Sequence, residues 1–128
     1  MNDPIADLLT RIRNARNARH RYVDLRPSKV KLQIIKVLHE QGFIDNFLVD
    51  EEHGKARIFL RYSDTRQPVI SGLKRVSAPG LRRYIGYREI PKIFGGMGVA
   101  ILSTPMGIID GETARTQKVG GELLCLVW

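Results

Sequence analysis

Apolar side chains recur at helical spacing in two early stretches of the chain. The first stripe consists of Ile5, Leu8, Leu9, Ile12 and Ala15. Pro4 precedes it and suits the first position of a helix, because the N–H that proline lacks has no partner there. The second stripe consists of Val30, Ile34, Ile35, Val37 and Leu38, after a capping residue at Ser28 and before a terminating Gly42. The pattern therefore predicts two amphipathic helices.

Alternating polar and apolar residues predict strands around the second helix. Residues 22–25 alternate over a short stretch, and residues 43–49 and 56–62 flank a polar turn at 51–55. Alternation over two runs joined by a turn is typical of an antiparallel hairpin with one buried face. The first part of the chain is thus predicted to be an α-β-α-β-β unit.

The polar segment 63–68 breaks this periodicity and ends in proline, so we expect a domain boundary within it. The predicted domains are residues 1–66 and 67–128. Strand-like pieces follow at 73–76, 82–87, 99–102 and 123–128, with one helical turn at 89–94 and a short helix at 111–117. The predicted fold class is α+β, in two small units, of which the C-terminal one is mostly β with one short helix.

Charge narrows the class of partner. The 128 residues include 21 Lys and Arg against 13 Asp and Glu, which gives a formal net charge of +8 and favours a polyanion. Residues 1–40 hold nine basic and four acidic side chains, residues 41–67 four and five, and residues 68–128 eight and four. A polyanion is expected to contact the two basic flanks and to avoid the hairpin between them. Nucleic acid is the favoured candidate for this partner, and an anionic membrane surface is the second candidate.

The sequence contains no arrangement of residues typical of a catalytic site. His20, His39 and His53 lack the spacing of metal ligands, and the single cysteine, Cys125, lies in an apolar stretch that indicates a buried thiol in a reducing compartment. The glycines at 95–98 precede a strand, whereas a phosphate-binding loop follows one. We expect no enzyme activity, no metal, no cofactor and no membrane partner. The apolar runs are far shorter than about 20 residues, which excludes a bilayer-spanning helix.

A turn of small hydroxyls and bare backbone follows the apolar run 99–102. It contains Ser103, Thr104 and Gly107, and the chain returns through Gly120 and Gly121. Hydroxyls that both donate and accept, beside glycines that permit close approach, suit the 2′-hydroxyls and phosphates of RNA. The alternative, that these are ordinary turn residues, stays open at this point.

Basic and aromatic residues outside this turn add candidate contacts. In the second unit they are Lys74, Arg75, Arg83 and Tyr84, a ring that could stack on a base or pack in the core. In the first unit they are Arg11 and Asn14, which lie off the apolar stripe, and Lys29. Lys29 and Lys31 begin the second helix, where cations oppose the helix dipole and indicate an anion nearby. A solvated basic face and phosphate contacts both fit this pattern.

Several segments, in order, resemble one known family. They are DPIADLLTRIRNA at 3–15, GFI at 42–44, LKRVS at 73–77, PGLR at 79–82, GMGVAILST at 96–104, AR at 114–115, GGE at 120–122 and VW at 127–128. At these spacings, over nearly the whole chain, they resemble the family of the eighth protein of the small ribosomal subunit in its bacterial form.

The resemblance implies a structural protein that binds the central domain of the small-subunit ribosomal RNA, promotes its folding and has neighbouring small-subunit proteins as partners. Its location would be the ribosome, in the cytoplasm or in an organelle. The residues implied at the RNA are Ser103, Thr104, Pro105, Gly107, Lys118, Gly120, Gly121 and Glu122. Pro105 departs from the Ser-Thr-Ser turn usual in the family. A free regulator that uses the same surface on its own operon messenger RNA is the alternative.

Overall fold

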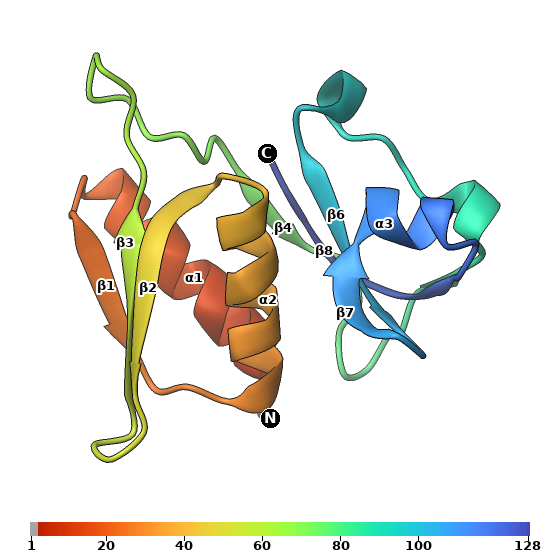
Figure 1. The fold of residues 1–128 in the computed structure, drawn as a ribbon, viewed down its shortest axis with the longest axis horizontal. Coiled ribbons are helices and arrows are strands. Elements are labelled where there is room, and N and C mark those ends of the chain that lie inside the picture. The colour runs from red at the N-terminus through yellow and green to blue at the C-terminus, as the bar shows by residue number, and fades with distance from the viewer. Residues whose placement is uncertain (1–2) are drawn as a thin grey trace. The chain divides into compact units, whose positions relative to one another are not determined.

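A computed structural model describes residues 3–128 (Figure 1). The fold is α+β, as predicted, and its packing divides into two compact units, Pro4–Ser71 and Gly72–Trp128, the second including Asp3. The domain boundary expected after residue 66 stays a prediction. No helix within residues 3–128 combines the length and apolar character needed to cross a membrane.

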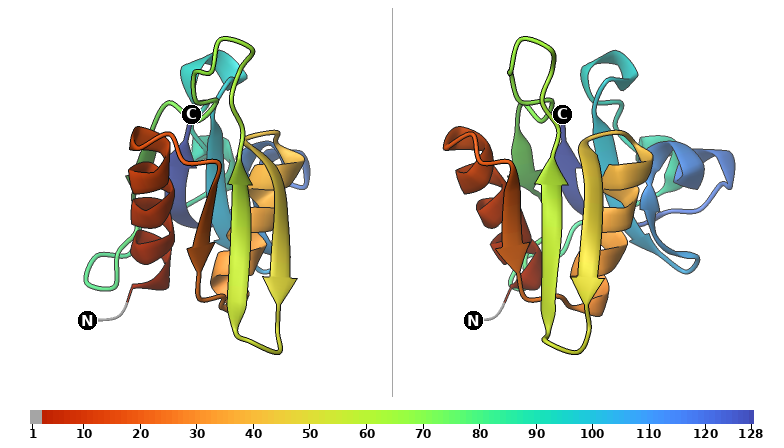
Figure 2. Two further views of the ribbon diagram at one scale, coloured as in Figure 1. Left: turned by 90° about the vertical axis from the view of Figure 1, so that its left-hand side faces the viewer. Right: turned by 60° about the vertical axis from the view of Figure 1, so that its left-hand side comes forward.

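The N-terminal unit has the predicted α-β-α-β-β order. Its elements are α1 (Pro4–Asn17), β1 (Tyr22–Leu25), α2 (Lys29–Glu40), β2 (Ile44–Asp50) and β3 (Lys55–Leu60). The strands form an antiparallel sheet in the order β1-β3-β2, so the last strand in sequence lies in the middle. Figure 2 shows that both helices lie on one side of this sheet.

The core of the N-terminal unit follows the sequence pattern closely. All five residues of the first helical stripe are buried, and on β3 the alternate residues Ala56, Ile58 and Leu60 face the helices. In α2, Ile34 and Leu38 are fully buried, but Val30 is 36% exposed, so its predicted burial was wrong. A helical side chain covers the turn N-terminal to itself, and Val30 lies in the first turn, where no such turn exists.

An ion pair joins α1 and α2 next to Val30, and its basic member, Lys31, is buried although the sequence pattern did not predict this. Lys31 is only 7% exposed, and its Nζ lies 2.7 Å from Asp7 Oδ2 and 3.0 Å from the carbonyl oxygen of Arg26. The anion expected near the start of α2 is therefore supplied by the protein itself. The hydrogen bond from Lys31 lowers the pKa of Asp7 below its ordinary value, against the effect of burial.

The C-terminal unit is organised around one strand, β8 (Gly121–Val127). The other elements are β4 (Leu73–Arg75), β5 (Tyr84–Ile85), β6 (Val99–Thr104), β7 (Gly107–Asp110) and α3 (Gly111–Thr116). The sheet order is β4-β8-β6-β7, and β5 also pairs with β8. The first part of β8 thus lies between β5 and β6, and all its pairings are antiparallel.

Three local predictions in this unit were wrong. Residues 107–110 form β7, although the segment was read as part of a turn, and β5 spans two residues where a strand over 82–87 was expected. In place of one helical turn at 89–94, short 3₁₀ turns occupy Tyr87–Glu89 and Phe94–Gly96. The helix α3 was predicted correctly, and Asp110 caps it by accepting a hydrogen bond from the Thr113 amide at 3.0 Å.

The core of the C-terminal unit packs α3 against the sheet. Its buried members are Ile90, Ala100, Leu102, Ala114 and Leu123. Cys125 is fully buried in β8, as the sequence indicated, and burial raises the pKa of its thiol to about 12. A thiol in this state is unreactive, since the thiolate is the nucleophile.

All three α-helices in residues 3–128 end with the same pair of backbone hydrogen bonds. In α3 the Lys118 amide donates to Arg115 and the Val119 amide donates to Ala114. The motif needs a left-handed residue just past the helix, and this residue is Arg19, Gly42 and Lys118 in turn, with φ of 57°, 79° and 56°. Glycine is the usual choice, because this conformation costs other residues about 1–2 kcal/mol. Two helix ends therefore retain a cation at a conformational cost.

We predict that Asp7→Asn destabilises the N-terminal unit at neutral pH by roughly 1–2 kcal/mol, because it leaves the buried Lys31 ammonium without its counter-charge. The loss is below that of a fully buried pair, since the Asp7 side chain is 42% exposed. Asp24→Asn, which breaks a more exposed pair with Arg57, is the control and should cost at most about 1 kcal/mol.

Urea unfolding at several pH values checks this prediction. The pKa of Asp7 is lowered in the folded state, so its contribution is present above the ordinary value of 3.8 and is lost as the pH falls through the lower folded value. A loss for Asp7→Asn that persists unchanged in acid would contradict the ion-pair explanation.

Candidate nucleic-acid interface

The turn between β6 and β7 is a two-residue hairpin locked by a side chain. Thr104 and Gly107 pair across it, and Pro105 and Met106 form its exposed tip. Proline fixes φ near −65°, which excludes the usual primed hairpin turns, and Gly107 absorbs the resulting twist at a φ of 111°. The Thr104 hydroxyl donates to the Gly107 carbonyl at 2.8 Å and accepts from the Met106 amide at 3.1 Å. Thr104 therefore shapes the turn from within.

Ser103 stands beside Thr104 with a different role. It is partly buried at the end of β6, and within residues 3–128 its hydroxyl has no hydrogen-bond partner. It pairs with Glu122 of β8, so the hydroxyl lies at the strand end where hairpin and β8 meet. Of the two hydroxyls predicted at the RNA, Ser103 is the one left free to bind a ligand.

The glycines at the start of β8 let three strands approach one another. A Cβ on Gly121 would collide with the carbonyl oxygen of Ser103, and one on Gly120 would collide with the carbonyl oxygen of Ile85. Neither glycine has a positive φ in the structure, so the requirement comes from space and not from backbone conformation. Bare backbone at these two positions brings β5 and the β6–β7 hairpin to the same end of β8.

Glu122 is the centre of a hydrogen-bond network beside these glycines. Its Oε2 accepts from the Ser77 hydroxyl and from the Arg82 guanidinium, at 3.0 Å in the second case. Ser77 is fully buried, and its oxygen accepts from the Arg83 amide at 3.1 Å. The Arg83 carbonyl in turn accepts from the Leu123 amide at 2.8 Å. These bonds tie the segment 77–83 to the start of β8.

The charge of Glu122 is stabilised in this position. Burial acts to raise the pKa of Glu122, but hydrogen bonds from Ser77 and Arg82 and the nearby charges of Arg82 and Arg75 lower it below its ordinary value. The side chain is 12% exposed and points its oxygen into the protein's own network. An acid placed this way repels phosphate little, because Arg82 neutralises it, and it holds the cationic segment in position.

Aromatic and apolar side chains stand out from this surface. Tyr84 of β5 pairs with Glu122 and is 72% exposed, so of the two fates considered for its ring, packing in the core is excluded. Leu81 and Met106 are 67% and 54% exposed. Exposed rings and apolar groups among basic residues suit the faces of bases and sugars.

Lys118 reaches the same region from the end of α3. It is exposed and lies two residues before Gly120, in the left-handed position described above. The structure thus brings Lys118, Gly120, Gly121, Glu122 and the hairpin residues 103–107 together with Arg83 and Tyr84. We call this set the hairpin surface. Pro105 at its tip is exposed and offers no amide donor.

Two other predicted contacts of the C-terminal unit lie further along β8. Lys74 is exposed opposite Leu126, four residues beyond Glu122, which is roughly 13 Å along the strand. Arg75 is occupied inside the protein, since its guanidinium donates to the Leu124 carbonyl at 2.7 Å and pairs with Asp3 at 3.3 Å. Lys74 and Arg75 therefore extend from the hairpin surface and do not form its centre.

The predicted contacts of the N-terminal unit are all on its surface. Asn14 and Lys29 are exposed, and Arg11, also exposed, makes an ion pair with Asp7 at 3.2 Å. Their part in binding remains a prediction.

Sequence reasoning missed Ser77 as part of the site, and it counted Arg82 among the basic residues near the turn without predicting its bond to Glu122. Each acts through Glu122, which is 45 and 40 residues away in sequence. A local pattern has no signal for such a pairing.

Within residues 3–128 one group of side chains is spaced closely enough for a metal ion. Asp50, Glu52 and His53 place ligand atoms within 4.8 Å of one another at the β2–β3 turn, and all three are exposed. Exposed acidic groups are common without a metal, and His53 is hydrogen-bonded to Asp50 at 2.7 Å. The cluster belongs to the β2–β3 hairpin, and none of its residues is part of the hairpin surface around the β6–β7 turn.

We predict that Glu122→Gln destabilises the C-terminal unit by roughly 1.5–3 kcal/mol at neutral pH, the scale of hydrogen bonds to a charged group. Because the folded-state pKa of Glu122 is lowered, the contribution is present above its ordinary value of 4.5 and disappears as the pH falls through the folded value. Denaturant unfolding of both proteins at neutral and acidic pH checks this. Curves that stay equally far apart at every pH would show that the carboxylate charge is irrelevant.

Comparisons with known proteins agree over the full chain. The family model described as ribosomal protein S8 matches residues 3–128. The small ribosomal subunit protein uS8 of Protochlamydia amoebophila (strain UWE25) is 53% identical, with 100% of this chain and 98% of that protein covered. The proteins of the same name from Chlamydia felis and Chlamydia trachomatis serovar D are 57% and 54% identical, with 99% of this chain and 97% of each covered. The chain therefore belongs to the ribosomal protein S8 family, which is structural and not enzymatic.

Proposed function

We propose that this protein is a structural constituent of the small ribosomal subunit that binds the central domain of the ribosomal RNA through the hairpin surface. Binding there promotes folding of that RNA region and assembly of the subunit. The N-terminal unit adds phosphate contacts through Arg11, Asn14 and Lys29. Its place is the cytoplasmic ribosome. The same surface would serve a messenger RNA that presents a similar structure.

The observation that carries the proposal is the convergence of three segments at the start of β8. The hairpin turn, the segment 77–84 and the end of α3 contribute a free hydroxyl, bare backbone, exposed cations and an exposed ring. The minor groove of an RNA helix is wide and shallow and displays 2′-hydroxyls and base edges. A surface of this composition is complementary to it.

The arrangement also separates positioning from recognition. Glu122, Ser77 and Thr104 form hydrogen bonds inside the protein, so they hold the surface in shape. Ser103, Tyr84 and Lys118 have their polar or aromatic groups available. Because the shape is set before binding, little conformational entropy is lost when RNA docks.

Binding to a central-domain ribosomal RNA fragment and to an unrelated hairpin of equal length, across a salt series, tests the proposal. We expect a preference of about a thousandfold or more that persists at high salt, the usual scale of specific over non-specific recognition. Equal affinities that fall together with salt would contradict the proposal, because they would show that only the net charge attracts phosphates.

We predict that Ser103→Ala and Thr104→Ala differ in their effects. Ser103→Ala should leave the free energy of unfolding unchanged within about 0.5 kcal/mol, since no internal bond is lost. It should weaken binding of the fragment by about 0.5–1.5 kcal/mol, the net value of one hydrogen bond. Thr104→Ala should lower both stability and affinity, because its hydroxyl holds the turn.

Calorimetric binding and denaturant unfolding of each variant check this pair, with Ser71→Ala as the matched exposed control. An unchanged affinity for Ser103→Ala would remove this hydroxyl from the interface. A stable, fully folded Thr104→Ala with a selective loss of affinity would instead make Thr104 a direct contact.

We predict that Lys118→Gly and Lys118→Asn keep or slightly raise stability, because glycine and asparagine both tolerate the left-handed conformation. Both should weaken RNA binding and reduce the salt slope of the affinity by about one. The salt dependence of fragment binding measures this. A slope equal to that of the unaltered protein would place Lys118 outside the interface.

A further inference from the structure

One face of the N-terminal sheet is open within its own unit. The helices α1 and α2 cover the other face, which holds Ala56, Ile58 and Leu60. Cross-strand pairing places the remaining residues of the three strands on the open face, among them Tyr22, Leu48, Arg57 and Phe59. Leu48 is 57% exposed and Tyr22 is 44% exposed. Exposed apolar side chains on an uncovered sheet face are typical of a binding surface.

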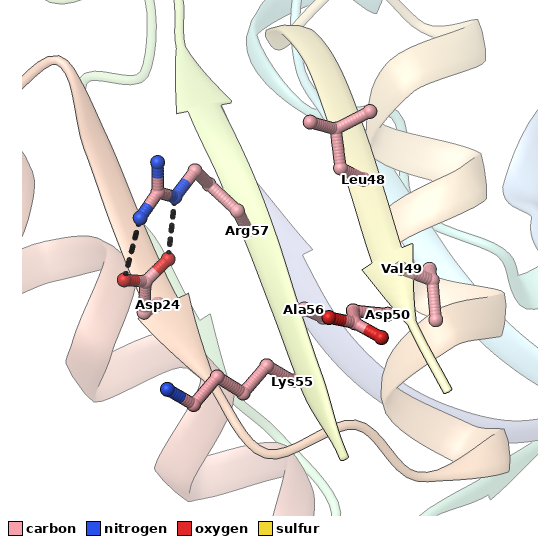
Figure 3. A pocket seen from close by; sticks show the side chains of 7 residues that line it. All are labelled: Asp24, Leu48, Val49, Asp50, Lys55, Ala56 and Arg57. Atoms are coloured by element: carbon pink, nitrogen blue, oxygen red, sulfur yellow. Dashed lines mark hydrogen bonds and ion pairs between the residues drawn. The ribbon is translucent and has the colours of Figure 1, made fainter. Parts of the chain in front are cut away.

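A shallow groove of about 450 Å³ runs over this face (Figure 3). Its lining residues on the open face are Asp24, Leu48, Asp50, Lys55 and Arg57, and it is also lined by Val49 and Ala56, which pair with each other and alternate with these positions along β2 and β3. Leu48 and Val49 come from β2, and the Asp24–Arg57 pair bridges β1 and β3 on the other side. Arg57 donates to Asp24 at 2.7 Å and 3.1 Å, and its guanidinium lies 3.9 Å from the centroid of the Tyr22 ring. The charge of Arg57 is thus neutralised by Asp24.

The lining of the groove is balanced in charge, with Asp24 and Asp50 against Lys55 and Arg57, but the β2–β3 hairpin beside it is acidic. The β2–β3 hairpin carries Asp45, Asp50, Glu51 and Glu52, all exposed. Within residues 3–128, Asp45, Glu51 and Glu52 form no ion pair, and Asp50 pairs with His53. Lys55 is the basic residue at this end of the groove that has no ion-pair partner within that range. A net acidic patch in a chain of charge +8 repels phosphate and attracts cations.

We propose that this groove docks a basic segment of another protein of the same particle. The segment places an apolar side chain against Leu48, and its Lys or Arg side chains reach the carboxylates of the hairpin. The charge complementarity selects this occupant over RNA. The groove shares no residue with the hairpin surface, so the inference goes beyond the RNA-binding function.

Docking takes place on the face of the sheet and not along its edge. β2 is an edge strand, but a bulge between Ile44 and Asn46 breaks its register. The Asn46 side chain also accepts from the Phe47 amide at 2.8 Å, which occupies a donor that an added strand would need. Bulges and self-satisfied amides of this kind prevent strand addition.

Cross-linking in the assembled small subunit tests the proposal. Leu48→Cys is labelled with a thiol-reactive photo-cross-linker, and the buried Cys125 does not compete for the label. Lys36→Cys, on an exposed position of α2, is the control. We expect position 48 to cross-link to a Lys- or Arg-rich segment of a neighbouring protein that position 36 does not reach. Cross-links from position 48 to RNA, or none to protein, would overturn the proposal.

A charge-reversal pair tests the complementarity with the isolated full-length chain. The probe is a synthetic peptide of alternating lysine and leucine, and binding is followed by fluorescence anisotropy. Glu52→Lys, on the hairpin, should weaken binding by about tenfold, whereas Asp64→Lys, an equal charge change on another exposed loop, should change it less than twofold. Equal losses of peptide affinity in the two variants would show that only the net charge matters, and they would contradict the proposed docking site.

The same two variants separate this inference from the proposed function. Both should bind the ribosomal RNA fragment with the affinity of the unaltered chain to within about twofold, apart from the shared charge effect. A selective loss of RNA affinity in Glu52→Lys would mean that the hairpin meets RNA, and the proposal of a protein partner would fail.

Discussion

The close approach of three backbones at the start of β8 is the constraint on which the candidate interface depends. Gly121 faces the carbonyl of Ser103 and Gly120 faces that of Ile85, with no room for a Cβ on either side. Without side chains at these positions, β5 and the β6–β7 hairpin converge on one end of the sheet. The surface they create is small, but each part of it comes from a different segment of the chain. Two glycines therefore decide whether a surface exists at all.

Glu122 shows how an acidic residue can belong to a surface for a polyanion. Its carboxylate does not face outward as a free charge, because Ser77 and Arg82 both donate to it. The effect is to hold Arg82, Arg83 and the adjoining Tyr84 in one arrangement. A free acid would repel phosphate, whereas this one orders the cations that attract it. Elsewhere in the chain, acidic residues gather on the β2–β3 hairpin. We propose that the groove beside this hairpin binds a basic protein segment and not RNA.

The sequence predicted elements wherever local periodicity and burial agree. The stripe from Ile5 to Ala15 and the alternation of Ala56, Ile58 and Leu60 were recovered because a single face of each element meets the core. β7 was not predicted because the turn before it begins with proline, a residue typical of loops. The turn also lacks the usual primed hairpin sequence, since the positive φ is at Gly107, after the two turn residues. β5 was overextended, since the Arg82 side chain bonds to Glu122 and the Arg83 amide bonds to the Ser77 hydroxyl, while the Arg83 carbonyl accepts from the Leu123 amide of β8.

The candidate site was predictable in composition but not in construction. The hydroxyls, the glycines and the basic residues could be read directly, and the structure gathers most of them. The network through Ser77, Glu122 and Arg82 joins residues 40 or more apart in sequence, which no local pattern encodes. The division between Thr104, bonded within the turn, and Ser103, left free, likewise depends on hydrogen bonds that exist only in the folded chain.

The most direct measurement for the central claim is amide chemical-shift mapping of the full-length protein as a central-domain ribosomal RNA fragment is added. The account predicts that the largest changes fall on residues 103–107, 118–122 and 81–84. Amides of the acidic hairpin at 45–55 should be nearly unaffected. Changes centred on that hairpin or spread evenly over every basic residue would contradict the account, because RNA would then be recognised by another surface or by charge alone.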